Sequence, residues 1–134
     1  RVEPIVLDGA SDAQMFAQQA EQLIKQHDVV ALFGTCTIES RKAVTKIVEK
    51  HGSLLFCPAP SAVGELSSRV IVTGMAPNQK VFPALMWSLK YIGNRFFIVG
   101  THDEYSRITA KLAQVVLDAM QAPIVGFVHI STDE

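Results

Sequence analysis

Hydroxyl and thiol side chains concentrate in residues 34–40, Gly-Thr-Cys-Thr-Ile-Glu-Ser, between an apolar run and an amphipathic stretch. A turn from a strand into a helix offers free backbone N–H groups and a positive helix end, which favour an anion or a polar oxygen. One interpretation is a site for a small polar ligand. The alternative is that Thr37 or Ser40 only caps the helix, which is the commoner role of such residues. No G-x-G-x-x-G or P-loop pattern is present, which gives nucleotide binding little support.

The two cysteines, Cys36 and Cys57, both fall at the ends of expected strands. They could form a disulfide, serve as a nucleophile with His102 as its partner, or be small buried thiols. The buried interpretation is favoured because no metal-ligand spacing or nucleophile motif surrounds them. His102 itself, beside two acidic residues, is typical of a solvated loop.

Aromatic side chains occur in two settings. Trp87 and Tyr91 share a helical stretch with apolar residues, which predicts packing in a core rather than a cofactor site. Tyr105 opens a helix at a sheet edge, where its ring can wall a pocket and its hydroxyl can reach a ligand.

The elements that must position these residues alternate between apolar runs and amphipathic stretches. Strands are expected at 2–7, 29–33, 53–57, 70–73, 96–99 and 124–130. Helices are expected from a cap at Ser11 to His27, from the 34–40 turn to Gly52, over 77–92 and from about Ile108 to Ala119. Most strand runs are continuously apolar, which favours parallel pairing. The predicted fold is therefore α/β, a doubly wound, mainly parallel sheet with helices on both faces, whose ligands gather at the carboxyl ends of the strands.

Composition excludes several classes. The chain has 134 residues, 49% of them hydrophobic, with 12 Lys and Arg against 13 Asp and Glu. This balance argues against nucleic acid as a partner, and the longest apolar runs are too short to span a bilayer. No pattern calls for a cofactor or a metal. Because the chain opens on Arg1 without an initiator Met, we expect it to be part of a longer gene product.

Four sequence segments together resemble one family: Val6–Asp12 (VLDGASD), Ser40–Val44 (SRKAV), Ala76–Gln79 (APNQ) and Val99–Thr101 (VGT), followed by Tyr105 and Arg107. The chain is similar to the urea and short-chain-amide branch of the type I periplasmic substrate-binding proteins. Members are considerably longer and have two doubly wound lobes that close on a small ligand. The resemblance implies that residues 1–94 form most of lobe one, without its opening strand and helix. Residues 95–134 would begin lobe two.

The chain departs from the family at the expected pocket. Cys36 and Ile38 replace an aromatic residue and a serine, Cys57 replaces a tyrosine in the Cys-Pro-Ala-Pro segment, and Asp103 replaces a tyrosine. An amide ligand would lose several hydrogen-bond partners. The residues expected to bind ligand are Thr35, Cys36, Thr37, Ile38, Ser40, Cys57, Ala59, Pro60, Asp103 and Tyr105.

The sequence thus predicts a non-enzymatic protein that binds a small polar organic solute resembling an amide, urea or a branched-chain amino acid. It would serve an ABC permease or a fused signalling domain, and periplasmic export is favoured over the cytoplasm. The alternative is a degenerate relative without a ligand, acting as a homodimerisation or interaction module through an exposed strand edge. A thiol enzyme using Cys36 or Cys57 is the remaining rival.

Overall fold

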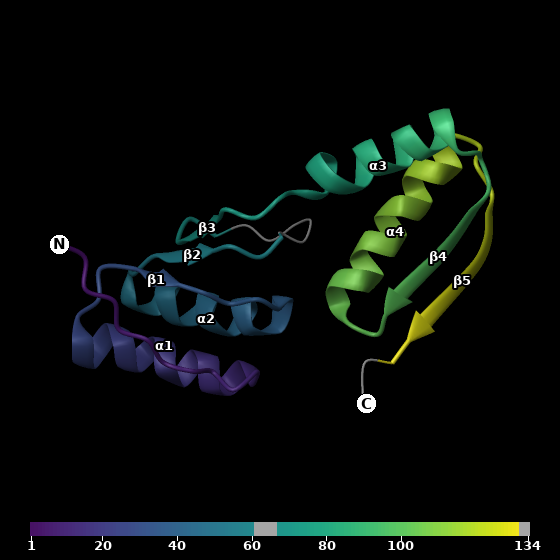
Figure 1. Cartoon of the computed structure of the whole chain (residues 1–134). Coiled ribbons are helices and arrows are strands. Elements are labelled where there is room, and N and C mark those ends of the chain that lie inside the picture. Colours follow the sequence, from purple (N-terminus) through teal and green to yellow (C-terminus); the bar gives the residue numbers. More distant parts are fainter. Residues whose placement is uncertain (61–66, 132–134) are drawn as a thin grey trace. The chain divides into compact units, whose positions relative to one another are not determined.

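The computed structural model describes residues 1–60 and 67–131. These residues divide into two compact units, one made of residues 1–60 and 67–74 and the other of residues 75–131 (Figure 1). Each unit contains both strands and helices. The predicted lobe boundary near residue 94 falls inside the second unit, and the assignment of lobes stays a prediction.

The first unit is a three-stranded parallel sheet with two helices. Along the chain it contains α1 (Ala13–His27), β1 (Leu32–Phe33), α2 (Ile38–His51), β2 (Leu55–Cys57) and β3 (Val70–Val72). The strand order is β1-β2-β3, with Leu32 opposite Leu55 and Leu55 opposite Val70. These residues pack with the apolar stripes of α1 and α2 into one core, which contains Ala20, Val44 and Val48. The side chains one position further along β1 and β3, Phe33 and Ile71, are exposed.

Local signals set the ends of these helices. Asp12, rather than the predicted Ser11, caps α1 by accepting a hydrogen bond from the Met15 N–H. Gly52 ends α2 in the left-handed conformation with φ 67°, as its position in the sequence predicts.

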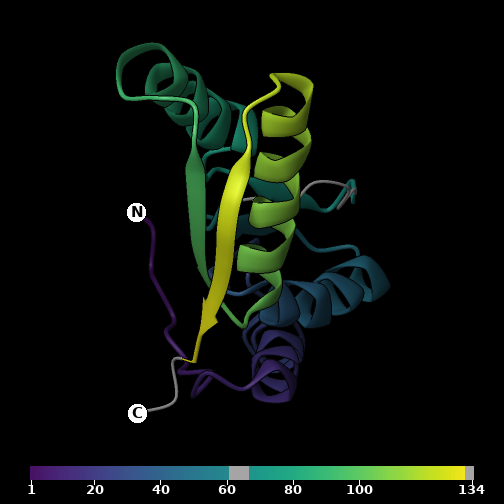
Figure 2. The same cartoon turned by 90° about the vertical axis from the view of Figure 1, so that its right-hand side faces the viewer.

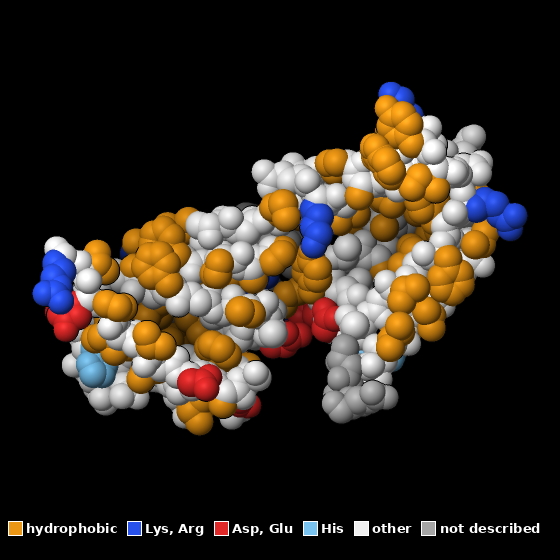
Figure 3. Space-filling model, viewed as in Figure 1, with side chains coloured by type: hydrophobic (Ala, Val, Ile, Leu, Met, Phe, Trp, Pro, Cys, Tyr) orange, Lys and Arg blue, Asp and Glu red, His pale blue; other side chains and the backbone are white. Residues whose placement is uncertain are grey.

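The second unit contains α3 (Pro77–Tyr91), β4 (Phe96–Thr101), α4 (Glu104–Ala119) and β5 (Ile124–Ile130). β4 and β5 pair in parallel, and α4 lies against one face of them (Figure 2). The other face carries Phe97, Val99, Val128 and Ile130, all of which are exposed. Hydrophobic side chains accordingly lie at the surface along these strands and over α3 (Figure 3).

The predicted α/β class with parallel sheets is confirmed, but two strand predictions are wrong. Residues 2–7 form no strand, and Val2 is 90% exposed. An apolar run becomes a strand only when a neighbour completes its hydrogen-bond ladder, and no described strand pairs with this one. The expected strand at 29–33 shortens to Leu32–Phe33 because only these residues pair with β2.

Candidate functional site

The N-terminus of α2 is closed by its own hydroxyl groups. Thr37 is the N-cap and accepts a hydrogen bond from the Ser40 N–H at 3.1 Å, while the Thr37 N–H donates to the Ser40 Oγ at 3.3 Å. The two hydroxyl oxygens are 3.0 Å apart. The capping interpretation is therefore confirmed. Ser40 is buried, whereas Thr37 is exposed.

Thr35 and Cys57 meet at the carboxyl ends of β1 and β2. The Thr35 hydroxyl donates to the Cys57 sulfur at 3.4 Å, and the Cys57 thiol is 3.4 Å from the Thr35 carbonyl oxygen. Both residues are buried, and Thr35 has the left-handed φ of 67° that residues other than glycine rarely adopt. Such a conformation costs free energy and persists only where the surrounding contacts hold it. The hydrogen bonds between Thr35 and Cys57 are contacts of this kind.

The cysteines differ in environment. Both are free; Cys57 is buried and Cys36 is exposed. The buried-thiol prediction is therefore correct for Cys57 and wrong for Cys36. Cys36 lies in the turn between β1 and α2, whose neighbours Thr35 and Ile38 take the buried positions.

Arg41, which the sequence analysis did not place in the site, lies beneath this edge. It is 2% exposed, and its Nη1 atom lies 3.7 Å from the Cys57 sulfur and 3.4 Å from the Pro60 carbonyl oxygen. The sequence could have indicated the burial of Arg41, because its position falls on the same helical face as Val44 and Val48, which form the apolar stripe of α2. The arginine connects α2 to the segment that follows β2.

The loops after β2 and β3 approach each other closely. A Cβ atom at Gly74 would overlap the backbone of Pro58 and Ala59. A glycine is therefore required there. The contact of Thr35 with Cys57 and the approach of Gly74 to Ala59 bring the residues that follow β1, β2 and β3 together at one edge, where Ala59 and Pro60 are half-buried.

Asp103 and Tyr105 belong to the second unit, at the N-terminus of α4. Asp103 is the N-cap and accepts a hydrogen bond from the Ser106 N–H at 2.8 Å. A hydrogen bond from the Thr101 hydroxyl, followed by that from Ser106, lowers the pKa of Asp103 below its ordinary value of 3.8. Tyr105 is half-buried. Asp103 is thus engaged in capping.

Two histidines that are far apart in the sequence lie together near the carboxyl ends of β4 and β5, His102 just after β4 and His129 within β5. The rings of His102 and His129 stack with centroids 5.2 Å apart, and His129 Nδ1 is 3.0 Å from the Thr101 carbonyl oxygen. The parallel register, which places Gly100 opposite His129, brings them together. The described residues contain no group of three or more His, Cys, Asp or Glu side chains suited to a metal ion.

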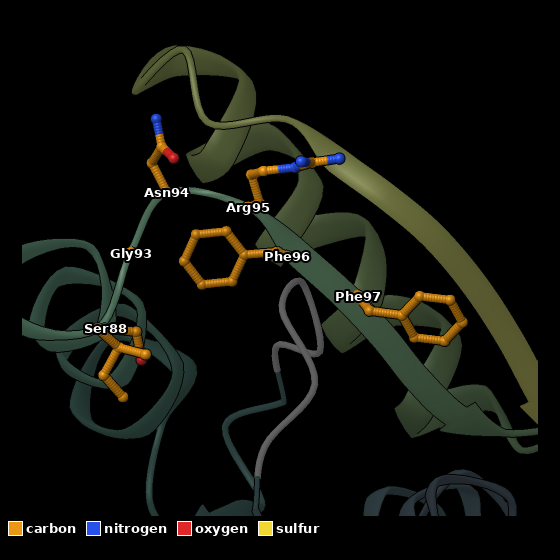
Figure 4. A pocket seen from close by; sticks show the side chains of 7 residues that line it. Ser88, Gly93, Asn94, Arg95, Phe96 and Phe97 are labelled. Carbon is orange, nitrogen blue, oxygen red and sulfur yellow. The ribbon is translucent and has the colours of Figure 1, made fainter.

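A shallow hollow of about 480 Å³ lies elsewhere in the second unit, between the end of α3 and the start of β4. Figure 4 shows Phe96 directed toward the end of α3, while Arg95 and Phe97 extend to the other side of the strand. None of the predicted ligand-binding residues lines it. None of the helices in residues 1–60 and 67–131 has the length and hydropathy needed to cross a membrane.

The family described as periplasmic binding protein domain matches residues 1–132. The chain belongs to this family. This confirms the broader part of the resemblance, the type I periplasmic binding protein fold. The urea and amide branch is a finer assignment that the match does not reach.

Solved structures agree with this family at low sequence identity. The chain is similar to an extracellular ligand-binding receptor from Rhodopseudomonas palustris HaA2, with a TM-score of 0.85, 16% identity, and coverage of 97% of this chain and 37% of the other. A solute-binding protein of an ABC transporter from R. palustris BisB5, in complex with 3,4-dihydroxybenzoic acid, gives a TM-score of 0.87, 15% identity and coverage of 96% and 36%.

A third similar structure is a branched-chain amino acid transporter substrate-binding protein from Streptococcus pneumoniae, in complex with isoleucine. Its TM-score is 0.80 at 18% identity, with 98% of this chain and 38% of the other covered. The periplasmic binding protein domain described here thus spans a little over a third of the length of these neighbours.

Proposed function

We propose that this periplasmic binding protein domain binds a small organic solute without catalysing a reaction, as part of an exported substrate-binding protein of an ABC importer. The observation that carries the proposal is the edge formed by the loops after β1, β2 and β3, within a chain that matches the family over residues 1–132. Ligands of open parallel sheets bind at this edge.

The chemistry of the edge suits a small, mostly uncharged ligand. Thr37 and Cys36 are exposed residues that carry a hydroxyl and a thiol, and Ala59 and Pro60 add half-buried apolar surface. An amide, urea or a branched-chain amino acid is the ligand class that we propose, and the Ser-Arg-Lys-Ala-Val and Ala-Pro-Asn-Gln segments support the amide branch. Residues Thr35, Ile38, Ser40 and Cys57 are buried and would shape the edge rather than touch the ligand. A role for Asp103 and Tyr105 stays a prediction.

Calorimetric titration of the full-length protein with urea, acetamide, leucine and isoleucine tests the proposal. We expect saturable heat with at least one of them. A Cys36→Trp variant should abolish that heat by filling the edge, whereas Lys46→Trp, an exposed position on α2 away from the edge, should leave it unchanged. No heat with any of the four ligands, or equal binding by Cys36→Trp, would contradict the proposal.

A second candidate function is an interaction module that has no ligand. It is supported by the hydroxyls of Thr37 and Ser40, which bond to each other, and by the burial of Thr35 and Cys57. Sedimentation equilibrium distinguishes the candidates, because a homodimer of the unliganded chain favours the module and a monomer at all concentrations argues against it. If the protein is a sensor and not part of an importer, we propose that a fused signalling domain responds to ligand binding.

A further inference from the structure

The outward face of α3 is apolar and aromatic, although solvent-facing helix surfaces are ordinarily polar. Trp87 is 56% and Tyr91 63% exposed, and the sequence prediction that they pack in a core is therefore wrong. Their rings lie 5.6 Å apart, and the Lys90 ammonium lies 4.9 Å from the centre of the Tyr91 ring. We define the α3 patch as Met86, Trp87, Lys90, Tyr91 and Ile92, of which the four apolar side chains are exposed.

In the sequence, the charged residues on either side of the α3 patch are all basic. Residues 66–102 contain four Lys and Arg and no Asp or Glu. In the described part of the chain, neither Lys90 nor Arg95 forms an ion pair. Both cations are therefore available to an acidic group from outside.

The α3 patch borders the hollow between α3 and β4. Ile92 lines the hollow together with Ser88 and Phe96, and the hollow's volume of about 480 Å³ accommodates an apolar side chain. Arg95 lies at the rim and extends to the opposite side of β4 from Phe96 (Figure 4). In Figure 3, hydrophobic side chains gather beside basic ones over this end of α3.

We propose that the α3 patch docks an acidic segment of a partner protein. The segment places an apolar side chain in the hollow and carboxylates beside Lys90 and Arg95. Trp, Tyr, Met and Arg are enriched in protein interfaces. Of these, Trp, Tyr and Arg contribute most often to the binding free energy. A membrane is the less suited occupant, because recognition of anionic lipid takes clusters of about four to eight cations.

Trp87 is the chain's only tryptophan, so its emission reports on the α3 patch directly. The probe is a synthetic 12-residue peptide with four glutamates around a central leucine. We expect saturable titration with a blue shift of Trp87 emission. Replacing the leucine with serine, or the glutamates with lysines, should weaken binding about tenfold or more.

Charge reversal within the protein locates the contact. Lys90→Glu should weaken peptide binding about tenfold and Arg95→Glu about fivefold, the scale of exposed ion pairs turned repulsive. Lys80→Glu, a cation on the same helix outside the α3 patch, is the matched control and should bind as the parent does. Far-UV circular dichroism checks that each variant is folded.

Three outcomes would overturn the proposal. One is an unchanged Trp87 emission up to millimolar peptide. Another is equal weakening by Lys80→Glu and Lys90→Glu. The third is a response to vesicles containing anionic phosphatidylglycerol without any response to the peptide, which would assign the face to a membrane instead.

Discussion

In each unit a helix joins two parallel strands, α2 between β1 and β2 and α4 between β4 and β5, yet the strands are buried to different extents. In the first unit Leu55, the first residue of β2, is 1% exposed. In the second unit Val99, at the centre of β4, is 59% exposed. The buried residues of the second unit lie on α4 and just before β5, namely Ala113, Leu117 and Ala122.

The difference follows from the number of layers and strands around each position. β2 has a strand on either side and two helices packing on its core-facing residues. β4 has one partner strand, and Val99 lies on the face away from α4. Parallel strands are stable when both faces are covered. In the first unit the helix-facing residues close into a core, whereas Phe33 and Ile71 on the opposite face are exposed, as Val99 is in the second unit.

Thiol reactivity gives the largest expected contrast between the units. In a Cys36→Ser variant, Cys57 should react with iodoacetamide about a thousandfold or more slowly than a free thiol, because reaction requires the unit to open. A cysteine introduced by Val99→Cys in a background without Cys36 and Cys57 should react at nearly the free-thiol rate. Mass spectrometry measures both rates. Similar rates would mean that the two strands are equally accessible.

Shortening one side chain in each of the same two strands separates the contributions of these side chains to the free energy of unfolding. Leu55→Ala should lower the free energy of unfolding by about 2–5 kcal/mol, because it leaves a cavity in the closed core. Val99→Ala, on the open face, should change it by less than about 0.5 kcal/mol. Urea unfolding followed by circular dichroism measures both, and hydrogen exchange assigns the loss to the first unit. An equal loss in the two variants would break the comparison.

The helix caps should contribute equally in the two units but respond differently to acid. Thr37→Ala and Asp103→Ala should each lower stability by about 1 kcal/mol at neutral pH. The lowered pKa of Asp103 stabilises the folded state above the ordinary value of 3.8, and this contribution is lost as the pH falls through the folded-state pKa. Unfolding curves at pH 7 and pH 2.5 test this. A pH-dependent cost for Thr37→Ala would contradict it.

The smallest effect concerns the ion cluster of the first unit. Glu21 contacts Lys25 at 2.8 Å, His51 at 3.0 Å and Lys50 at 3.1 Å. These hydrogen bonds, that from Lys25 foremost, lower the pKa of Glu21 to about 2. The resulting stabilisation is complete above the ordinary value of 4.5 and is lost as the pH falls through about 2.

Carboxyl NMR titration measures the Glu21 pKa directly. Lys25→Met should raise it toward 4.5, whereas Lys111→Met, on α4 of the second unit, should leave it unchanged. A Glu21 pKa that stays near 2 in Lys25→Met would show that Lys50 and His51 suffice.

Features set by neighbours in the sequence were predictable. The cap at Thr37, the stop at Gly52 and the helical stripe through Val44 and Val48 depend on residues within a few positions of one another. The bounds of β5, Ile124–Ile130, agree with the apolar run for the same reason.

Features that depend on distant residues could not be predicted with the same certainty. Residues 2–7 have a strand's composition but find no partner in the described sheets. At the candidate site, the sequence placed Thr35 and Cys57 at one edge and favoured a buried thiol, but it did not show that Thr35 would be buried or that Arg41 would contact the Cys57 sulfur.

The sequence by itself determined the α/β class, the ends of α2 and the family, because periodicity, capping residues and short segments such as Ser-Arg-Lys-Ala-Val are local properties. Only the tertiary structure decided which apolar side chains leave water. Leu55 and Trp87 are both strongly apolar, yet one is buried and the other exposed. Burial depends on what packs against a residue from elsewhere in the chain, and a strand or helix pattern does not carry that information.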